Sequence, residues 1–279
     1  MQPNLSFIRE KPLCSYLRYL SIRKRASNNE FNKLKELHSV MDTKSFTTYF
    51  QPLVELDTGK KIGYEVFNRP PISQSFPSTE NFYDFVGQSD LIYRVEEICR
   101  TLSLERYSSS IQDQQGREEM ESSIFLNVHP KLLKNSVDTL MSTIQLFNKY
   151  QIPTSRVVFE ISEKTSIEEY KEFEKVLSQY RLHGFRFALD DVGSGYNSLI
   201  TLVYLKPEFI KLDKMLIQNI DQDLTKQQLV KMLTEFSTKS QTKLVAEGIE
   251  RNEELVFLKE HGVHIGQGYA IGKPKQHLQ

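Results

Sequence analysis

The sequence is poor in the features that mark several large protein classes. It contains two cysteines, Cys14 and Cys99, in 279 residues, and these cannot form a disulfide framework for so long a chain. Neither belongs to a Cys-x-x-Cys pair, so a thiolate zinc site is unsupported. The sequence contains no run of about 18 apolar residues, the length needed to span a bilayer. Its charged first segment lacks the apolar region typical of a signal peptide. We therefore expect a soluble cytoplasmic protein without stable membrane insertion.

An excess of charge of either sign is also missing, because 36 basic side chains balance 36 acidic ones. A protein without net charge does not attract a nucleic acid polymer or a membrane surface through its overall field. A local basic pocket for a small anionic ligand is still compatible with this balance. The composition, 39% hydrophobic and 26% charged residues, is ordinary for a globular protein, and the length suits one large domain or two small ones.

Residues 1–30 differ from the rest of the chain. Their six basic residues against two acidic ones leave an excess of four positive charges, and Leu13, Leu17 and Leu20 recur at helical spacing. We interpret this segment as a basic extension or tether docked on the main body, with residues 31–279 as the barrel domain. A basic amphipathic membrane contact is the alternative, but the segment is short and lacks Trp or a run of Phe.

From residue 31 onward, helical patterns alternate with short apolar runs, which is typical of βα units and a mainly parallel sheet. The turn sequence Asp57-Thr58-Gly59 separates the first two strand candidates and allows an antiparallel hairpin. About eight strands in ~250 residues match the size of a (β/α)8 barrel, so the predicted fold class is α/β. The predicted helices are 30–41, 91–106, 167–182 and 224–238, and the predicted strands are 49–56, 62–67, 124–126, 157–159, 185–189, 209–210, 244–246 and 264–265.

Polar side chains stand where most of these strands end, and the carboxyl ends of barrel strands meet at one face. Such a cluster of carboxylates with one lysine would be protonated unless further positive charge were present. Oxygen ligands without a nearby Cys or His indicate hard cations, Mg²⁺ or Mn²⁺. The residues expected at this face are Glu65, Asn127, Glu160, Asp190, Asp191, Lys211 and Glu247, with Gln267 at the rim.

Asp190 and Asp191 are neighbours, and neighbouring side chains on a straight strand point to opposite sides. They can bind metal together only if the chain bends, and Gly193 and Gly195 follow them closely. Two ions about 4 Å apart would activate a hydroxide and hold a phosphoryl group for in-line displacement.

Each residue alone also has a structural explanation. A carboxylate at a strand end is more often a helix N-cap than a ligand, and Lys211 could pair with Asp213. The joint occurrence of these residue types at successive strand ends is what favours a metal site.

The motifs in their order resemble those of the EAL-domain family, cyclic di-GMP phosphodiesterases. The resemblance covers most of the chain, from about Tyr49 to Tyr269. It depends on the segments Glu65-Val66-Phe67-Asn68-Arg69, Leu126-Asn127, Glu160-Ile161-Ser162-Glu163, 190–199, Lys211-Leu212-Asp213, Ala246-Glu247-Gly248-Ile249-Glu250 and Gln267-Gly268-Tyr269.

The resemblance implies a barrel with an antiparallel first strand and hydrolysis of cyclic di-GMP to linear pGpG with Mg²⁺ or Mn²⁺. It also implies a role for each matched residue. The metal ligands would be Glu65, Asn127, Glu160, Asp190 and Asp191, and the catalytic residues would be Lys211, Glu247 and Asp191. Arg69 and Gln267 would bind the substrate, and Glu163 would support the loop after Asp191.

The chain departs from the family's usual motif at a few positions. Val66 and Phe67 replace Ala and Leu, and Val192 and Ser194 replace Phe and Thr in the loop after Asp191, which in the family joins metal binding to homodimer contacts. Every matched metal and lysine position is kept, which favours an active phosphodiesterase. The alternative is a catalytically weak or inactive cyclic di-GMP receptor, or a protein-interaction module.

Overall fold

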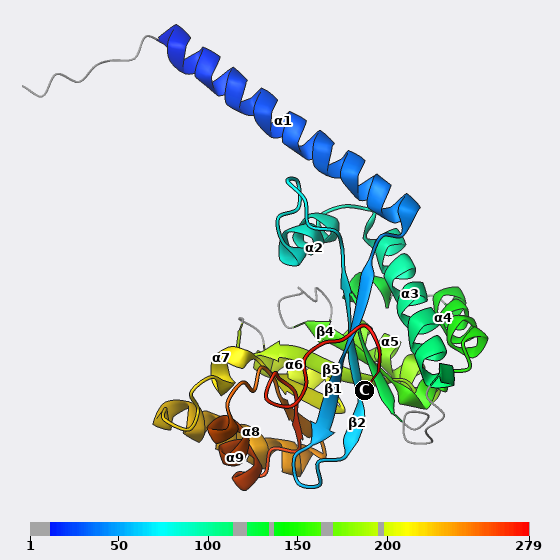
Figure 1. Cartoon of the computed structure of the whole chain (residues 1–279), viewed down its shortest axis with the longest axis vertical. Coiled ribbons are helices and arrows are strands. Elements are labelled where there is room, and N and C mark those ends of the chain that lie inside the picture. The colour runs from blue at the N-terminus through cyan, green and yellow to red at the C-terminus, as the bar shows by residue number, and fades with distance from the viewer. Residues whose placement is uncertain (1–11, 114–121, 134–136, 163–169, 195–197, 279) are drawn as a thin grey trace, which may run out of the picture. The chain divides into compact units, whose positions relative to one another are not determined.

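The structure is a computed structural model that describes residues 12–113, 122–133, 137–162, 170–194 and 198–278 (Figure 1). The chain divides into two compact units. The first unit runs to Phe46 and includes Pro70–Val95, and the second comprises Thr47–Arg69 and Glu96–Gln279. No helix in the described part of the chain combines the length and apolar character needed to cross a membrane.

The first unit consists of helix α1 (Pro12–Thr43), helix α2 (Thr79–Gly87) and the connections around them. Phe82 on α2 is fully buried and meets the rings of Phe46 and Phe76 edge-on, at centroid distances of 5.7 and 5.0 Å. The helix predicted at 30–41 is present, but α1 already begins at Pro12. The basic segment is therefore helical from Pro12 and continues without a break past residue 30. The division at residues 30 and 31 and the tether role stay predictions.

The second unit is a closed barrel with strands in the order β1 to β8 (Figure 1). All eight predicted strands are present and most extend a few residues further than predicted. Their bounds are β1 Thr47–Glu55, β2 Lys61–Arg69, β3 Ser123–Asn127, β4 Val157–Ser162, β5 Arg186–Val192, β6 Phe209–Leu212, β7 Lys243–Ala246 and β8 Ile265–Gly266.

From β2 onward, helices connect successive strands of the barrel, as the alternation in the sequence predicts, whereas a short turn joins β1 to β2. The helix predicted at 167–182 is described from Tyr170 onward. The remaining helices are α3 Ile92–Asp113, η2 Pro130–Leu132, α4 Val137–Lys149, η3 Thr154–Arg156, α5 Tyr170–Leu182, α6 Ser198–Leu205, α7 Lys214–Ile217, α8 Leu224–Ser240 and α9 Asn252–Glu260.

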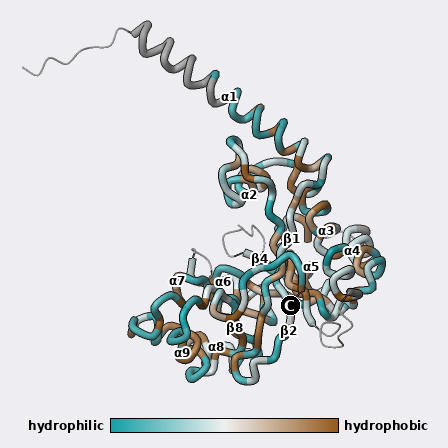
Figure 2. The backbone as a smooth tube through the Cα atoms, viewed as in Figure 1, coloured by the Kyte–Doolittle hydropathy of each residue, from teal (hydrophilic) through white to brown (hydrophobic). Residues whose placement is uncertain are grey.

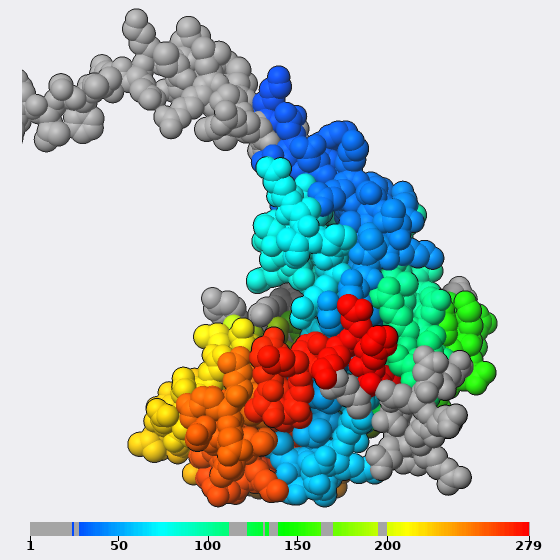
Figure 3. All heavy atoms as spheres, in the orientation of Figure 1, coloured from blue at the N-terminus to red at the C-terminus, as the bar shows by residue number. Residues whose placement is uncertain are grey.

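The first strand runs antiparallel to both of its neighbours, β2 and β8, while all other neighbouring strands are parallel. This confirms the antiparallel first strand. The C-terminal segment adds a short bridge to β1, in which Phe50 and Lys275 exchange two backbone hydrogen bonds of 2.7 and 2.9 Å. In Figure 3 these last residues, coloured red, lie at the surface of the unit.

Hydrophobic residues lie along the strands and the helix faces that cover them (Figure 2). A separate apolar cluster contains one buried side chain from seven of the strands and therefore fills the barrel interior. Its members are Leu53, Phe125, Val158, Ala188, Phe209, Val245 and Ile265.

Candidate active site

The apolar layer inside the barrel fixes which side chains form the next layer. Because strand side chains alternate between two faces, the residue two positions further along each strand also points inward. From Phe125, Val158, Ala188, Phe209, Val245 and Ile265 this step leads to Asn127, Glu160, Asp190, Lys211, Glu247 and Gln267. The predicted site residues thus lie directly beyond a packed hydrophobic floor, at the carboxyl ends of the parallel strands.

Lys211 on β6 is the centre of this layer. It is fully buried, and its Nζ lies 3.1 Å from Glu65 Oε2, 2.6 Å from Glu160 Oε1, 3.1 Å from Asp190 Oδ1 and 2.7 Å from Glu247 Oε1. Glu65 and Lys211 are on strands β2 and β6, across the barrel from one another. One ammonium group therefore holds together carboxylates that come from four different segments of the barrel: β2, β4, β5 and the residue after β7.

The alternative pairing of Lys211 with Asp213 is wrong. Asp213 Oδ1 instead accepts a hydrogen bond of 2.7 Å from the Met215 backbone N–H and caps the short helix α7. A strand-end carboxylate does act as an N-cap here, but it is not one of the residues around Lys211.

The single positive charge of Lys211 does not balance the four carboxylates that contact it. Burial, with repulsion from Glu65, raises the pKa of Glu160 well above its usual range. Burial also raises the pKa of Asp190 and that of Glu247. For Lys211, burial alone would lower the pKa, but the four surrounding carboxylates outweigh it and raise that pKa well above its usual range.

Asp190 and Asp191 act on the same side of the barrel because β5 is irregular there. The pairing of β5 with β6 shifts register between Leu189 and Val192, and Asp191 has φ 59°, in the left-handed region. Such a bulge changes the direction of a side chain that would otherwise point to the opposite face. The predicted bend is present, but it lies at Asp191 itself, two residues before Gly193.

Two groups of carboxylates can each bind a metal ion. One group contains Glu65, Glu160 and Asp190, and the other contains Asp190, Asp191 and Glu247; within each group the ligand oxygens lie within 4.8 Å of one another. Asp190 belongs to both groups. Oxygen donors with raised pKa values suit hard divalent cations, whose charge would stabilise the ionised carboxylates. The residues present therefore fit Mg²⁺ or Mn²⁺.

Two of the predicted residues have amide side chains that contact the same carboxylates. Asn127 Nδ2 is 3.4 Å from Glu65 Oε1 and 3.3 Å from Glu160 Oε2, so its side chain lies among the carboxylates. Asn127 is also exposed to solvent. Gln267 is buried rather than at the rim, and its Nε2 donates to Glu65 Oε2 at 2.7 Å and to Gln51 Oε1 at 3.1 Å.

Gln51 is a site residue that the sequence analysis missed. It lies opposite Glu65 in the pairing of β1 with β2, and its own Nε2 donates to the Gly272 carbonyl at 2.9 Å. Because β1 runs antiparallel, the residue beyond Leu53 in the direction of the site is two positions earlier in the chain, not later. The sequence does contain a signal for Gln51, a polar residue inside the strand candidate 49–56. It marks the site only if that strand is followed from its carboxyl end toward its amino end.

One predicted residue lies apart from this cluster. Arg69 is exposed at the end of β2, four residues after Glu65, with its guanidinium carbon 4.8 Å from the centre of the Tyr49 ring. At about 3.3 Å per strand residue, it is on the order of 13 Å beyond Glu65 on the same face. Glu163 lies outside the described residues.

The comparisons with known proteins agree with this geometry. The family model described as "EAL domain" matches residues 34–274. The chain belongs to the EAL domain family. Its closed α/β barrel superposes on solved EAL structures, as described below.

Two curated relatives match most of this chain. The chain is 28% identical over 246 residues to the "Probable cyclic di-GMP phosphodiesterase PdeB" of Escherichia coli K12, covering 86% of this chain and 45% of the relative. It is 30% identical over 246 residues to the "Cyclic di-GMP phosphodiesterase RocR" of Pseudomonas aeruginosa, covering 85% of this chain and 60% of the relative. The chain thus spans about half the length of these relatives.

Solved EAL structures have the same fold. The EAL enzyme Bd1971 with bound cAMP superposes with a TM-score of 0.80 at 22% identity, covering 96% of this chain and 73% of that one. A standalone EAL protein from Vibrio cholerae O395, solved in its cyclic di-GMP-bound form, has a TM-score of 0.70 at 26% identity and covers 84% of this chain and 94% of that one.

Proposed function

We propose that this EAL-domain chain is a metal-dependent phosphodiesterase that hydrolyses cyclic di-GMP to linear pGpG. The observation that carries the proposal is the ring of carboxylates around Lys211, which forms two groups able to hold metal ions. The names of the relatives in Escherichia coli and Pseudomonas aeruginosa and the ligand of the Vibrio cholerae structure support the choice of cyclic di-GMP as substrate.

The metal-binding residues would be Glu65, Asn127, Glu160, Asp190 and Asp191. Mg²⁺ or Mn²⁺ held by these residues would supply Lewis-acid activation of a water and stabilisation of negative charge on the phosphoryl oxygens. In the net reaction one water molecule is consumed. A bond forms between its oxygen and one phosphorus atom of cyclic di-GMP, while the P–O bond to one ribose oxygen breaks and that oxygen takes up a proton.

The other residues of the site supply charge, proton transfer and orientation. Lys211 stays positively charged, because four carboxylates raise its pKa, and it can hold the attacking water or a phosphoryl oxygen. Glu247 has a raised pKa and 18% of its side chain is exposed, so it can exchange a proton with a bound water. Gln267 holds Glu65 in place through the 2.7 Å hydrogen bond. Arg69, exposed beyond the acidic cluster, would contact a substrate phosphate.

The test is incubation of the full chain with cyclic di-GMP and either Mn²⁺ or Mg²⁺, with separation of products by chromatography. We expect pGpG from the native sequence, and no pGpG from Glu65→Ala or Glu247→Ala, because each removes a carboxylate that contacts Lys211 Nζ. Absence of turnover with both metals would refute the proposal. Tight binding of intact cyclic di-GMP would then indicate a receptor. Homodimer formation through the loop after Asp191 also stays a prediction, to be measured by light scattering.

A further inference from the structure

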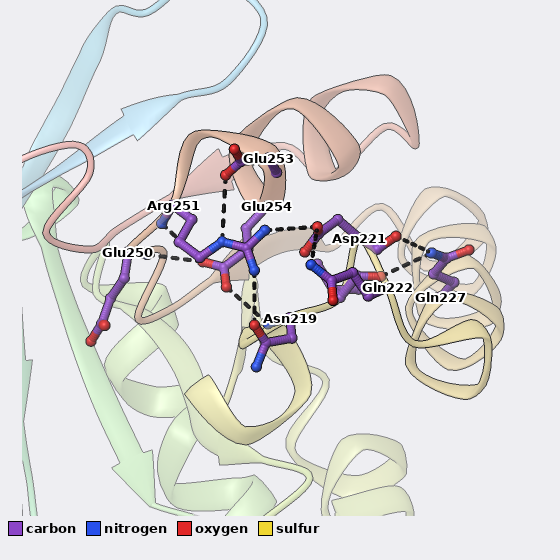
Figure 4. Close-up of polar contacts among 9 residues, drawn as sticks. Asn219, Asp221, Gln222, Gln227, Glu250, Arg251, Glu253 and Glu254 are labelled. Carbon is purple, nitrogen blue, oxygen red and sulfur yellow. Dashed lines mark hydrogen bonds and ion pairs between the residues drawn. The ribbon is translucent and has the colours of Figure 1, made fainter.

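Helix α9, which follows the loop that carries Glu247, contains a buried carboxylate that the proposed reaction does not use. Glu254, in the first turn of α9, is 2% exposed. Its Oε2 accepts the backbone N–H groups of Glu250 at 3.0 Å and Arg251 at 3.1 Å. Its Oε1 accepts the backbone N–H of Asn219 at 2.8 Å. Figure 4 shows this carboxylate between the two chain segments.

The two segments follow the strands of two proposed catalytic residues. Glu250 is three residues after Glu247, in the loop between β7 and α9. Asn219 is eight residues after Lys211, in the turn at residues 218–222 that follows α7. Glu247 and Lys211 form the 2.7 Å ion pair of the site. A single carboxylate group therefore joins the loops that lead away from both members of this pair.

The Glu247 loop needs such an anchor because strand pairing ends just before it. The β6–β7 ladder ends with Leu212 opposite Ala246, and the Glu247 backbone N–H still donates to the Leu212 carbonyl at 3.2 Å, so strand pairing stops at Glu247. The next residue, Gly248, has φ +65°, a conformation in which glycine is freer than other residues. Beyond Gly248, the loop returns to defined contacts at Ile249, which pairs with the segment from Gln267 to Ala270, and at the Glu254 carboxylate.

Arg251 completes the connection between the two loops. Its guanidinium donates to Asn219 Oδ1 at 2.8 Å and to Asp221 Oδ2 at 2.7 Å (Figure 4). Asn219 is in the left-handed region, with φ 58°, and in this conformation its backbone N–H points to Glu254. Capping of α9 explains the bond from Arg251 N–H to Glu254. It does not explain the bond from Asn219, which comes from a different loop.

We infer that Glu254 is a positioning residue that fixes Glu247 relative to Lys211 by clamping the loops after β6 and β7. The inference rests on the proposed function, because its consequence is measured in the hydrolysis reaction. A side-chain amide at this position would have one oxygen and would direct an NH₂ group toward a backbone N–H. Glu254→Gln therefore breaks the clamp with little change in size.

The first test measures the clamp itself, without substrate. Hydrogen exchange of the full chain, read by mass spectrometry, should be at least about tenfold faster in segments 218–222 and 247–251 of Glu254→Gln than in the native chain. Glu253→Gln is the matched control, since Glu253 is the neighbouring residue, is 64% exposed and makes one 3.4 Å contact with Arg251. Exchange in Glu254→Gln equal to that in Glu253→Gln would overturn the inference.

The second test measures the consequence for the reaction. We expect kcat of Glu254→Gln to fall about 10- to 100-fold, since a displacement of about 1 Å at a reacting group can have this effect. KM and the affinity for cyclic di-GMP with Ca²⁺ should change less than about threefold. A decrease in kcat/KM that comes only from a higher KM, with kcat unchanged, would overturn the inference, as would kinetics equal to those of the native chain. Inactivity of the native chain would refute the proposed function, while the exchange measurement would still decide the clamp.

A third variant covers the case in which Glu254→Gln does not fold. Glu254→Asp keeps the charge but is shorter by one methylene, so it cannot reach both loops at once. We expect it to unfold cooperatively, to show faster exchange in one of the two segments, and to lose kcat. Native exchange and native kcat in Glu254→Asp would overturn the inference.

Discussion

Replacing Lys211 with methionine removes the one charge that the four carboxylates share. Methionine has a similar length and no charge, so Lys211→Met leaves Glu65, Glu160, Asp190 and Glu247 facing one another without the ammonium group that lies 2.6–3.1 Å from each of them. Breaking a buried ion pair by removing one partner lowers the free energy of unfolding by about 3–5 kcal/mol. We expect a loss of this size in metal-free protein at pH 8.

The loss should depend on pH in a defined direction. Burial already raises the pKa values of Glu160, Asp190 and Glu247, so the folded metal-free state takes up protons that the unfolded state releases. Stability is then greatest below the ordinary carboxyl pKa near 4 and falls as pH rises through the raised values. Lys211 opposes these shifts, so its removal raises the pKa values further. The destabilisation by Lys211→Met should therefore be smaller at pH 5 than at pH 8.

Urea unfolding followed by circular dichroism, at both pH values with a chelator present, measures this difference. Lys239→Met is the control, because Lys239 is 75% exposed and pairs with a surface glutamate. Its unfolding midpoint should be close to that of the native chain at both pH values. Excess Mg²⁺ should restore part of the stability lost in Lys211→Met, since metal binding stabilises the folded state. An equal loss at pH 5 and pH 8 would refute the electrostatic reasoning.

Three further predictions concern single residues. Burial raises the pKa of Glu96 to about 7 despite the opposing Arg100, so its contribution to stability is complete below pH 4.5 and lost as pH rises through 7. In the native chain this group should lower the free energy of unfolding by about 3 kcal/mol between these pH values. Glu96→Gln should abolish that decrease in urea unfolding experiments. Gly248→Ala should lose about 1–3 kcal/mol more stability than Gly59→Ala, because both have left-handed φ but only at Gly248 would a Cβ atom meet Lys214, at 2.5 Å; equal losses in calorimetry would contradict the contact. Mg²⁺ at 100 times its Kd should raise the free energy of unfolding of the native chain by about 2.7 kcal/mol, and its Tm accordingly. The same Mg²⁺ concentration should raise the Tm of Asp190→Asn much less.

Much of the fold could be predicted from the sequence because its local patterns agree with one another. Short apolar runs such as Val157-Val158-Phe159 alternate with helical patterns, and each run leads to a polar residue. Alternation within a strand then places Glu160 two residues beyond Val158 on the inward face. The candidate metal ligands followed from this pattern and from the family resemblance.

Other features could not be read from the sequence, since they depend on contacts between distant segments. Lys211 and Glu65 are 146 positions apart, and their contact requires closure of the barrel. Gln51 enters the site because β1 runs in the opposite direction to the other strands. The clamp at Glu254 requires two loops that follow neighbouring strands.

The sequence by itself determined the positions of the strands along the chain, the inward-facing residues and the supply of oxygen ligands near the strand ends, because side-chain alternation and residue chemistry are local properties. Only the tertiary structure decided how these ligands combine. The bulge that brings Asp191 to the side of Asp190 is a shift of register between two strands, which no single strand can define. The four contacts of Lys211 likewise exist only after the sheet has closed and excluded water from its centre, where one ammonium group is surrounded by carboxylates from across the barrel.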